Sequence, residues 1–481
     1  MSHLTSIYRP GFGNLTDLYQ LTMAYGYWQQ GLAERRSVFH LFYRKPPFGD
    51  RFAIAAGLPL ALDLIERLRF SADDVQYLGG LTGRGGRPLF TEPFLNYLQR
   101  LRFSGDVYAI PEGEAVLPHE PLLRIEAPLI QAQLLETALL TLINFSTLIA
   151  TKAARLRAAA GPDDTLLEFG LRRAQGIDGG LTGSRAAYLG GCDATSNVWA
   201  GQYYGIPVRG THAHSWVMVH DTEPEAFAAY AEAMPHNCTL LVDTYNTEQG
   251  VKNAIEVGHQ LRKDGHDLAG IRLDSGDLAA LSKTARRLLD EAGFPETAIV
   301  ASNDLDEYRI AELKAAGAPI TVWGVGTRLA TAYDQPALGG VYKLAAIADE
   351  QGVLQDRIKL SEQRIKTSLP GRLQVRRFAN PADGRPLGSL IYDEDAGPAS
   401  GFATGTPTDL ARAETSDLLQ PYIMDGKQLT SPGPLPEART RALRNYPAYQ
   451  SALADGTGFV SGISADLEER RRVLSEAAPV I

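Results

Sequence analysis

Six short apolar segments between residues 165 and 327 constrain the fold of this chain more than any other feature of its sequence. Each ends in small polar or charged residues, and several are near-continuous apolar runs, as expected of parallel strands that are buried on both faces. Helical patterns separate most of them, and this alternation predicts a parallel sheet with right-handed crossovers. The expected strands are 165–170, 206–208, 239–243, 268–274, 298–302 and 320–325. The expected helices are 194–204, 223–234, 247–263, 277–292 and 304–315.

The polar strand ends favour a barrel over an open doubly wound sheet, which is the alternative. In a (β/α) barrel the loops after the strands build the active site at one face, so the polar ends would converge at a single mouth. We therefore predict an irregular TIM-like α/β barrel over residues 131–345. Residues 1–130 mix helices and strands and predict an additional α+β domain. Residues 346–481 alternate short strands with Pro and Gly turns, and either complete the N-terminal domain or form a third.

Composition excludes several classes of protein. The net charge of −9 argues against a general binder of nucleic acid or of anionic membranes. The two cysteines, Cys192 and Cys238, form no Cys-x-x-Cys pair, which excludes a zinc knuckle or ribbon and fits a reducing compartment. The first residues lack a secretory signal pattern, and the longest apolar stretch, 134–150, is interrupted by polar residues and predicts a buried helix. We expect a cytoplasmic protein without a membrane span.

The stretch from Gly210 to Val217 is the most distinctive strand end. It places His212 and His214 beside Thr211. Helix capping explains Ser, Thr, Asp and Asn at a strand end, but it needs no pair of histidines. His214 is a candidate general base or a nucleophile toward phosphate, and His212 is open to the same roles, whereas the spacing shows no further metal ligands. If the segment is extended, both histidines point to the same side.

Other strand ends indicate a phosphorylated substrate. Arg172 and Arg272 stand where arginine has no capping role. Gly324-Val-Gly-Thr327 follows the last strand; glycines let backbone N–H groups approach an anion, and the loops after the last strands are the usual phosphate site of such barrels. A plain turn is the alternative reading of this short motif. Asp274 and Asp277 suit ribose hydroxyls or Mg²⁺ carried on a diphosphate, although both also suit a helix cap.

The chain resembles the nicotinate phosphoribosyltransferases, ATP-coupled enzymes of NAD salvage. Each motif alone is weak, but their joint occurrence in order is specific. The resemblance covers most of the chain, apart from residues 59–105 and the far C-terminus. The motifs are Leu15-Thr-Asp-Leu-Tyr-Gln20, Phe42-Tyr-Arg-Lys-Pro-Pro-Phe-Gly49, Glu168-Phe-Gly-Leu-Arg-Arg173, Gly191-Cys-Asp-Ala-Thr-Ser-Asn-Val198, Gly210-Thr-His-Ala-His-Ser-Trp216, Arg272-Leu-Asp-Ser-Gly-Asp277, Gly324-Val-Gly-Thr327, Gly340-Val-Tyr-Lys-Leu344 and Lys359-Leu-Ser.

The resemblance implies an α/β barrel beside an α+β domain, and a homodimer with the active site at the subunit interface. It implies that ATP phosphorylates His214 and that Arg272 and Asp274 share the catalytic work. Phe169 would stack on the pyridine ring of nicotinate, and Tyr19 would act in the partner's site. The nicotinate contacts implied are Tyr19, Phe169, Arg172, Thr211 and Arg272.

The resemblance also implies a site for 5-phosphoribosyl 1-diphosphate. Thr327 would hold the 5-phosphate, and Arg44 and Lys45 would cover the diphosphate. Mg²⁺ would arrive with the diphosphate or with ATP, not at a fixed protein site. The residues implied for this substrate are Arg44, Lys45, Asp274, Ser302, Asn303, Gly324, Gly326 and Thr327.

Three other functions remain in competition. Nicotinamide phosphoribosyltransferase is the main alternative, because the carboxylate of Asp193 near the ring would favour an amide. A quinolinate phosphoribosyltransferase would need no ATP and more cationic groups for two carboxylates. A non-catalytic nucleotide sensor on the same fold is disfavoured, since every expected strand end is present.

Overall fold

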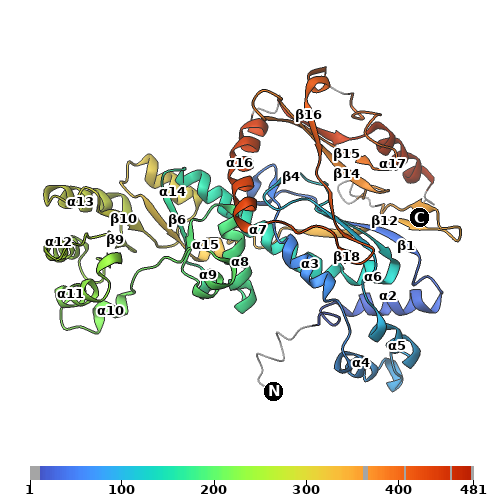
Figure 1. Ribbon diagram of the computed structural model, residues 1–481, viewed down its shortest axis with the longest axis horizontal. Coiled ribbons are helices and arrows are strands. Elements are labelled where there is room, and N and C mark those ends of the chain that lie inside the picture. Colours follow the sequence, from blue (N-terminus) through green and yellow to red (C-terminus); the bar gives the residue numbers. More distant parts are fainter. Residues whose placement is uncertain (1–10, 361–366, 406–407, 455–457, 478–481) are drawn as a thin grey trace. The chain divides into compact units, whose positions relative to one another are not determined.

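The structure is a computed structural model that describes residues 11–360, 367–405, 408–454 and 458–477 of the chain (Figure 1). The chain divides into two compact units: unit 1 comprises Met1–Thr147 and Ala337–Ile481, and unit 2 comprises Leu148–Pro336. The C-terminal segment thus belongs to the same unit as the N-terminal one. Helix α7 (Glu136–Ala160) contributes its first half to unit 1 and its second half to unit 2.

Unit 1 is built on a seven-stranded sheet in the order β13-β12-β1-β5-β3-β17-β18. Strand β1 lies inside this sheet because seven of its eight residues are buried, and it pairs antiparallel with both β5 and β12. The strands are β1 (Arg36–Tyr43), β3 (Asp106–Ala109), β5 (Leu123–Pro128), β12 (Gly340–Ala348), β13 (Leu354–Asp356), β17 (Gln420–Met424) and β18 (Lys427–Gln428). The N-terminal strands β1, β5 and β3 therefore form the centre of this sheet, and strands from the C-terminal part of the chain flank them on both sides.

A four-stranded sheet and a short two-stranded ladder complete the β structure of unit 1. The former has the order β16-β14-β15-β19, and the latter pairs β2 with β4. These strands are β2 (Ala53–Ile54), β4 (Ala115–Val116), β14 (Leu373–Ala379), β15 (Pro386–Asp393), β16 (Glu414–Asp417) and β19 (Val460–Ile463). The helices are α2 (Leu18–Gln29), α3 (Leu58–Glu66), α4 (Ala72–Gly79), α5 (Glu92–Arg100), α6 (Leu129–Leu134), α16 (Leu435–Ala454) and α17 (Ala465–Ala477).

Helix α7 carries the apolar stretch that the sequence predicts to be buried. Its length and composition would allow it to cross a membrane, but 67% of its most apolar 18-residue window is buried inside the protein. A core helix of a globular protein passes the same test.

Unit 2 confirms the predicted parallel α/β architecture. Its six strands are all paired in parallel, in the order β7-β6-β11-β10-β9-β8. The strands are β6 (Thr165–Glu168), β7 (Ala194–Thr195), β8 (Thr239–Leu241), β9 (Gly270–Leu273), β10 (Ala298–Ala301) and β11 (Val322–Val325). The helices are α8 (Gly176–Gly190), α9 (Val198–Tyr204), α10 (His214–Met218), α11 (Glu223–Ala233), α12 (Thr247–Lys263), α13 (Leu278–Glu291), α14 (Glu307–Ala315) and α15 (Thr327–Ala330).

One strand was predicted in the wrong place. Residues 206–208 form no strand; Val208 makes only an isolated bridge to Thr195, and the strand is β7, where the sequence predicted the start of a helix. The helix begins later, at Val198, because the side chain of Asn197 accepts a hydrogen bond from Ala200 N and so caps it. β7 and β8 are consequently the two ends of the strand order.

Short polar side chains cap the helices that follow the strand ends of unit 2. Asn246 caps α12, and Asp306 caps α14. Asp277 caps α13 through Ala279 N and Ala280 N, which is the alternative role foreseen for it.

Candidate active site

Arg272, in β9, is the centre of a set of polar side chains at the C-terminal ends of the strands of unit 2. Its guanidinium donates from Nε to Ser302 Oγ at 2.9 Å, from Nη1 to Thr211 Oγ1 at 2.9 Å and from Nη2 to Asp274 Oδ1 at 2.8 Å. Three chain segments thus meet at one side chain, and we call Arg272, Thr211, Asp274 and Ser302 the Arg272 group. A guanidinium held on three sides is already oriented for a planar anion.

Asp274 is held as a carboxylate by its neighbours. Burial alone would raise its pKa, but the hydrogen bond from Ser302 Oγ and the charge of Arg272 outweigh that effect, and the pKa of Asp274 is lowered. The group therefore combines a fixed cation with a fixed anion at one strand end.

Asp243, just after β8, supports the turn that carries Asp274. Its Oδ2 accepts hydrogen bonds from Asp274 N at 2.8 Å and from Ser275 Oγ at 2.7 Å. Its other oxygen, Oδ1, is buried and has no hydrogen-bond partner within the part of the chain that the structure describes. Sequence reasoning gave this residue no role, because an aspartate at a strand end is equally explained as a helix cap.

His214 is the first residue of α10 and lies beside the Arg272 group. Its Nδ1 is 3.1 Å from Thr244 Oγ1, and its Nε2 is 3.7 Å from Asp274 Oδ2. The side chain is 39% exposed, so a substrate can reach the ring. The sequence pattern assigned no role to Thr244.

His212 does not point to the same side as His214, so the condition of an extended segment is not met. The ring of His212 lies 4.7 Å from that of Tyr230 on α11, and its Nε2 accepts a hydrogen bond from Leu241 N at 3.1 Å. Burial lowers the pKa of His212. The two histidines diverge because α10 begins at His214, which ends the two-residue alternation of an extended chain.

Phe169 explains the glycines at 324 and 326. The ring follows β6 and is nearly buried, and the Arg272 Cζ lies 5.7 Å from its centroid. A Cβ on Gly324 would come within 2.7 Å of two ring atoms of Phe169, and a Cβ on Gly326 within 3.2 Å of the Phe169 carbonyl oxygen. These glycines therefore seat Phe169, a packing role that the sequence pattern could not distinguish from anion binding. Thr327 follows as the first residue of α15.

Glu168 organises the strand end next to Phe169. Its Oε2 accepts from Ser184 Oγ at 2.8 Å and from Thr195 Oγ1 at 2.5 Å, and its Oε1 accepts from Gly170 N. This buried network gives the motifs around Glu168 and Thr195 a structural role that sequence reasoning did not assign.

Two of the predicted residues of unit 2 stand apart from the Arg272 group. Arg172 is exposed, and its Nη1 donates to Phe169 O at 3.4 Å. Asn303 is exposed and has a φ of 93°. Among the described residues, neither side chain is hydrogen-bonded to the Arg272 group.

The remaining predicted residues, Tyr19, Arg44 and Lys45, belong to unit 1. Tyr19 lies on α2 and is 49% exposed. Arg44 and Lys45 follow β1, and burial lowers the pKa of Arg44. Burial also lowers the pKa of Lys343 on β12, and the charges of Arg44 and Lys359 add to that effect. Unit 1 therefore gathers cationic side chains that sequence reasoning identified only in part.

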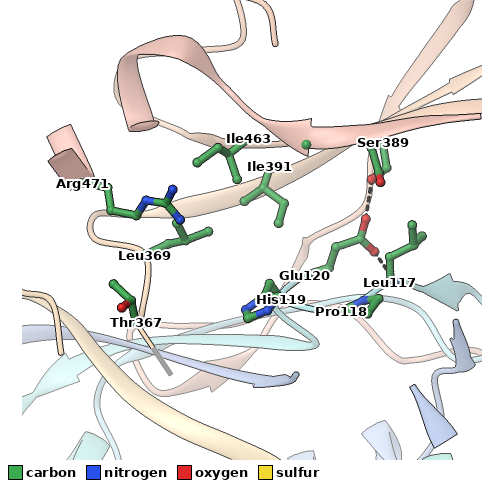
Figure 2. Close-up of a pocket in the computed structure, with 12 residues that line it drawn as sticks. Leu117, Pro118, His119, Glu120, Thr367, Leu369, Ser389, Ile391, Ile463 and Arg471 are labelled. Atoms are coloured by element: carbon green, nitrogen blue, oxygen red, sulfur yellow. Dashed lines mark hydrogen bonds between the residues drawn. The ribbon is translucent and has the colours of Figure 1, made fainter. Parts of the chain in front are cut away.

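Unit 1 also contains a cavity of about 330 Å³, which Figure 2 shows. None of the predicted site residues lines it. Glu120 at its wall is neutralised: Arg377 Nη2 donates to Glu120 Oε2 at 2.8 Å, Leu117 N donates to the same oxygen at 2.8 Å, and Arg377 Nη1 and Ser389 Oγ donate to Oε1. The cavity thus offers no free carboxylate.

No cluster of three or more His, Cys, Asp or Glu side chains that could hold a metal ion occurs among the described residues. At the strand ends, the Asp243 carboxylate accepts a hydrogen bond from the backbone N–H of Asp274.

Comparison with known proteins first gives the class. Residues 15–144 match the family model described as the nicotinate phosphoribosyltransferase (NAPRTase) N-terminal domain, and residues 165–355 match that described as the nicotinate phosphoribosyltransferase (NAPRTase) family. The second match covers every strand of unit 2, including those that carry the Arg272 group. The fold and the strand ends are thus those of a phosphoribosyltransferase.

Individual relatives agree with this class. The nicotinate phosphoribosyltransferase of Bacillus subtilis (strain 168) is 50% identical over 382 residues, which is 79% of this chain and 76% of that protein. The nicotinate phosphoribosyltransferase of Homo sapiens is 38% identical and covers 92% of this chain and 94% of its own length. The crystal structure of the human enzyme superimposes with a TM-score of 0.79 at 33% identity, covering 95% and 99% of the two chains. The chain belongs to the nicotinate phosphoribosyltransferase family.

Proposed function

We propose that the protein joins nicotinate to 5-phosphoribosyl 1-diphosphate to form nicotinate mononucleotide and diphosphate, and that ATP drives the reaction through a phosphorylated His214. The observation that carries the proposal is the Arg272 group, with His214 beside it, in a chain of this family.

Arg272 suits the carboxylate of nicotinate. A guanidinium has five N–H groups, and three of those of Arg272 donate to Ser302, Thr211 and Asp274. Two remain, one on each terminal nitrogen, which is the number a carboxylate needs for a two-point bond. Phe169, beside the guanidinium, offers an apolar face for the pyridine ring. Nicotinate N1 would then attack C1′ of the ribose as diphosphate leaves.

The nicotinamide alternative loses its argument from sequence. Asp193 accepts a hydrogen bond from Leu166 N at 2.8 Å and another from Arg157 Nη2. Leu166 lies near the start of β6, whereas Phe169 follows its end. The carboxylate that would favour an amide is therefore engaged at the opposite end of the strand from the Arg272 group.

His214 suits transient phosphorylation. Its Nδ1 is engaged by Thr244, its Nε2 lies 3.7 Å from Asp274 Oδ2, and 39% of the side chain is exposed. In the phosphorylation step a ring nitrogen attacks the γ-phosphorus of ATP, an N–P bond forms, and ADP leaves with the electrons of the broken P–O bond. Water later hydrolyses the phosphoimidazole. The phosphorylated loop would bind its substrates more tightly and couple ATP hydrolysis to synthesis.

Mg²⁺ fits the same strand ends. The unpartnered Asp243 Oδ1 and the anionic Asp274 are the hard oxygen donors that Mg²⁺ prefers. A Mg²⁺ ion delivered with the diphosphate would neutralise the charge that builds on this leaving group. Thr327 and the backbone of residues 324–327 would hold the 5-phosphate, and Arg172 and Asn303 would join the site only after a local rearrangement.

The protein would act as a homodimer, in which Tyr19, Arg44 and Lys45 of the partner subunit approach the strand ends. Exposed apolar side chains on α2 and α9 support an interface: Leu18 is 51% exposed and Val198 is 69% exposed. Aromatic and aliphatic side chains with this exposure are common where subunits meet.

One assay tests the function directly. Product formation is measured with nicotinate, nicotinamide or quinolinate, each with and without ATP. We expect nicotinate to be used, and used faster with ATP. A preference for nicotinamide or quinolinate would overturn the substrate assignment.

A His214→Ala variant tests the coupling. It should lose the acceleration by ATP, while His236→Ala, which removes an exposed histidine elsewhere in unit 2, should keep it. An ATP effect that survives in His214→Ala would refute the phosphohistidine.

A further inference from the structure

Strands β7 and β8 are the two ends of the strand order of unit 2. The loop that carries Thr211 and His214 makes hydrogen bonds to both of these strands. On one flank, Thr195 N donates to Pro207 O at 3.0 Å and Arg209 N donates to Thr195 O at 3.0 Å. The start of the loop is thus attached to β7 by backbone hydrogen bonds of the kind that join two strands.

On the other flank, a side chain makes the connection. Val242 N, just after β8, donates to Arg272 O toward β9, so the N–H of the preceding residue, Leu241, points to the opposite edge of β8. There it donates to His212 Nε2 at 3.1 Å. Leu241 is 1% exposed, so water cannot replace this acceptor. A buried backbone N–H without an acceptor is unfavourable.

The imidazole of His212 is held in this position by its surroundings. Its Nδ1 lies 3.2 Å from Ala213 O, and its ring meets that of Tyr230 edge to face, with 4.7 Å between the centroids. Because Nε2 accepts from an N–H, it must carry a lone pair, and the ring proton must be on Nδ1, where it is donated to Ala213 O. The geometry therefore requires one neutral tautomer.

We propose that His212 closes the ring of strands in unit 2, its Nε2 taking the place of the backbone carbonyl that a seventh strand would offer to Leu241 N, and that this bond positions Thr211 and His214. His212 is then a positioning residue: it faces α11, while Thr211 accepts from Arg272 Nη1 and His214 lies beside Asp274 on the other face of the loop. The closure itself does not depend on which reaction the protein catalyses. Its effect on catalysis rests on the proposed function.

A matched pair of substitutions tests the closure. In His212→Gln the side-chain carbonyl oxygen can reach the place of Nε2, whereas in His212→Asn the shorter side chain reaches only the place of Nδ1. Hydrogen exchange of the peptide that contains Leu241 should be about tenfold or more faster in His212→Asn, and close to wild type in His212→Gln. His236→Asn, at an exposed histidine, should change nothing. Equal exchange in all of these proteins would overturn the proposal.

Activity then tests positioning. In His212→Asn, we expect kcat/KM for nicotinate and the rate of His214 phosphorylation to fall by roughly tenfold, and His212→Gln should restore both. A loss that Gln does not restore would overturn the positioning role. A wild-type protein that does not use nicotinate at all would refute the proposed function, while the exchange experiment would still decide the closure.

A measurement on the unmodified protein guards against a variant that fails to fold. In ¹⁵N-histidine-labelled wild type, the signal of His212 is identified by its absence in His212→Gln. It should show the proton on Nδ1 and an unprotonated, hydrogen-bonded Nε2. A proton on Nε2 would overturn the proposal.

Discussion

The two units each contain an arginine, a carboxylate and a serine joined by hydrogen bonds, yet the two sets are suited to different tasks. In unit 1, Arg377 meets both oxygens of Glu120, and Ser389 Oγ donates to the same carboxylate. These side chains are almost completely buried, with 7% and 2% of Arg377 and Glu120 exposed. In unit 2, Asp274 of the Arg272 group keeps 30% of its side chain exposed.

The two sets differ in whether N–H groups of the arginine remain available to bind a substrate. Arg377 also donates to Ala115 O and Ser389 Oγ, so its terminal nitrogens are occupied by protein groups. Arg272 keeps one N–H on each terminal nitrogen and stands at the end of a parallel strand. The same chemistry therefore stabilises a fold where it is enclosed and can recognise a substrate where it is open.

The largest expected effect is a loss of stability when the buried set of Arg377, Glu120 and Ser389 in unit 1 is disrupted. Arg377→Ala leaves Glu120 buried without its cation, so the free energy of unfolding should fall by about 3–5 kcal/mol. Urea unfolding followed by circular dichroism measures this change. Turnover per folded molecule should stay near wild type. The double variant Arg377→Met/Glu120→Leu should regain part of the stability, and a single variant as stable as wild type would contradict the contrast between the two sets.

Arg272→Lys should have the next largest effect, and on activity rather than stability. Lysine keeps the charge but cannot make a two-point hydrogen bond to a carboxylate. The value of kcat/KM for nicotinate should therefore fall roughly 10- to 150-fold, which corresponds to about 1.5–3 kcal/mol of lost transition-state stabilisation. Steady-state kinetics with nicotinate gives the value, and thermal unfolding should change little. Arg287→Lys, on the exposed face of α13, is the matched control. Unchanged kinetics would remove Arg272 from the site.

Thr244→Val tests the support of His214 with a smaller effect. Valine keeps the shape of the side chain but removes the hydroxyl that engages Nδ1. The activation free energy for phosphorylation of His214 should therefore rise by about 0.5–1.5 kcal/mol, which slows the step by up to roughly tenfold. Rapid-quench measurement of the phosphoprotein is the readout. A rate equal to that of wild type would mean that the hydroxyl does not orient the ring.

The smallest effect concerns pH. The lowered pKa of Asp274 keeps it ionised as the pH falls, and the carboxylate's contribution is lost only when the pH drops through that lowered value. Ser302→Ala removes one of the hydrogen bonds that lower it, so the pKa should rise toward the ordinary value of 3.8. The acid limb of the kcat/KM profile should move to higher pH by less than about one unit. A shift to lower pH would mean that the Ser302 hydroxyl does not stabilise the carboxylate.

The sequence predicted unit 2 better than unit 1, for a physical reason. Strand and helix alternate locally in unit 2, and parallel strands bring their ends together whatever the loop details. In unit 1, the pairing of Ser37 with Ile347 joins residues that no local pattern connects. Short elements were missed for the same reason: β7 has two residues, too few to show a period.

Within the site, it was easier to predict which residues take part than in which direction their side chains point. Arg272 was recognised because arginine at a strand end has no capping role. The direction of His212 could not be predicted because the start of α10 at His214 has no strong capping signal: Ala213 occupies the N-cap. Asp243 and Thr244 were passed over because their strand end also fits a cap, and the packing of Gly324 against the ring of Phe169 is not visible in the sequence pattern.

The position of the N-terminal strands between C-terminal strands in the seven-stranded sheet has a consequence for synthesis. β1 emerges early from the ribosome and can pair with β5, but its other partner, β12, begins at Gly340. All of unit 2 is translated in the meantime. The nascent chain therefore completes its second unit before its first, and it carries an apolar, half-paired strand through that interval. Such an edge invites pairing with other chains, so the period between the two halves of unit 1 is when a chaperone would protect this protein most.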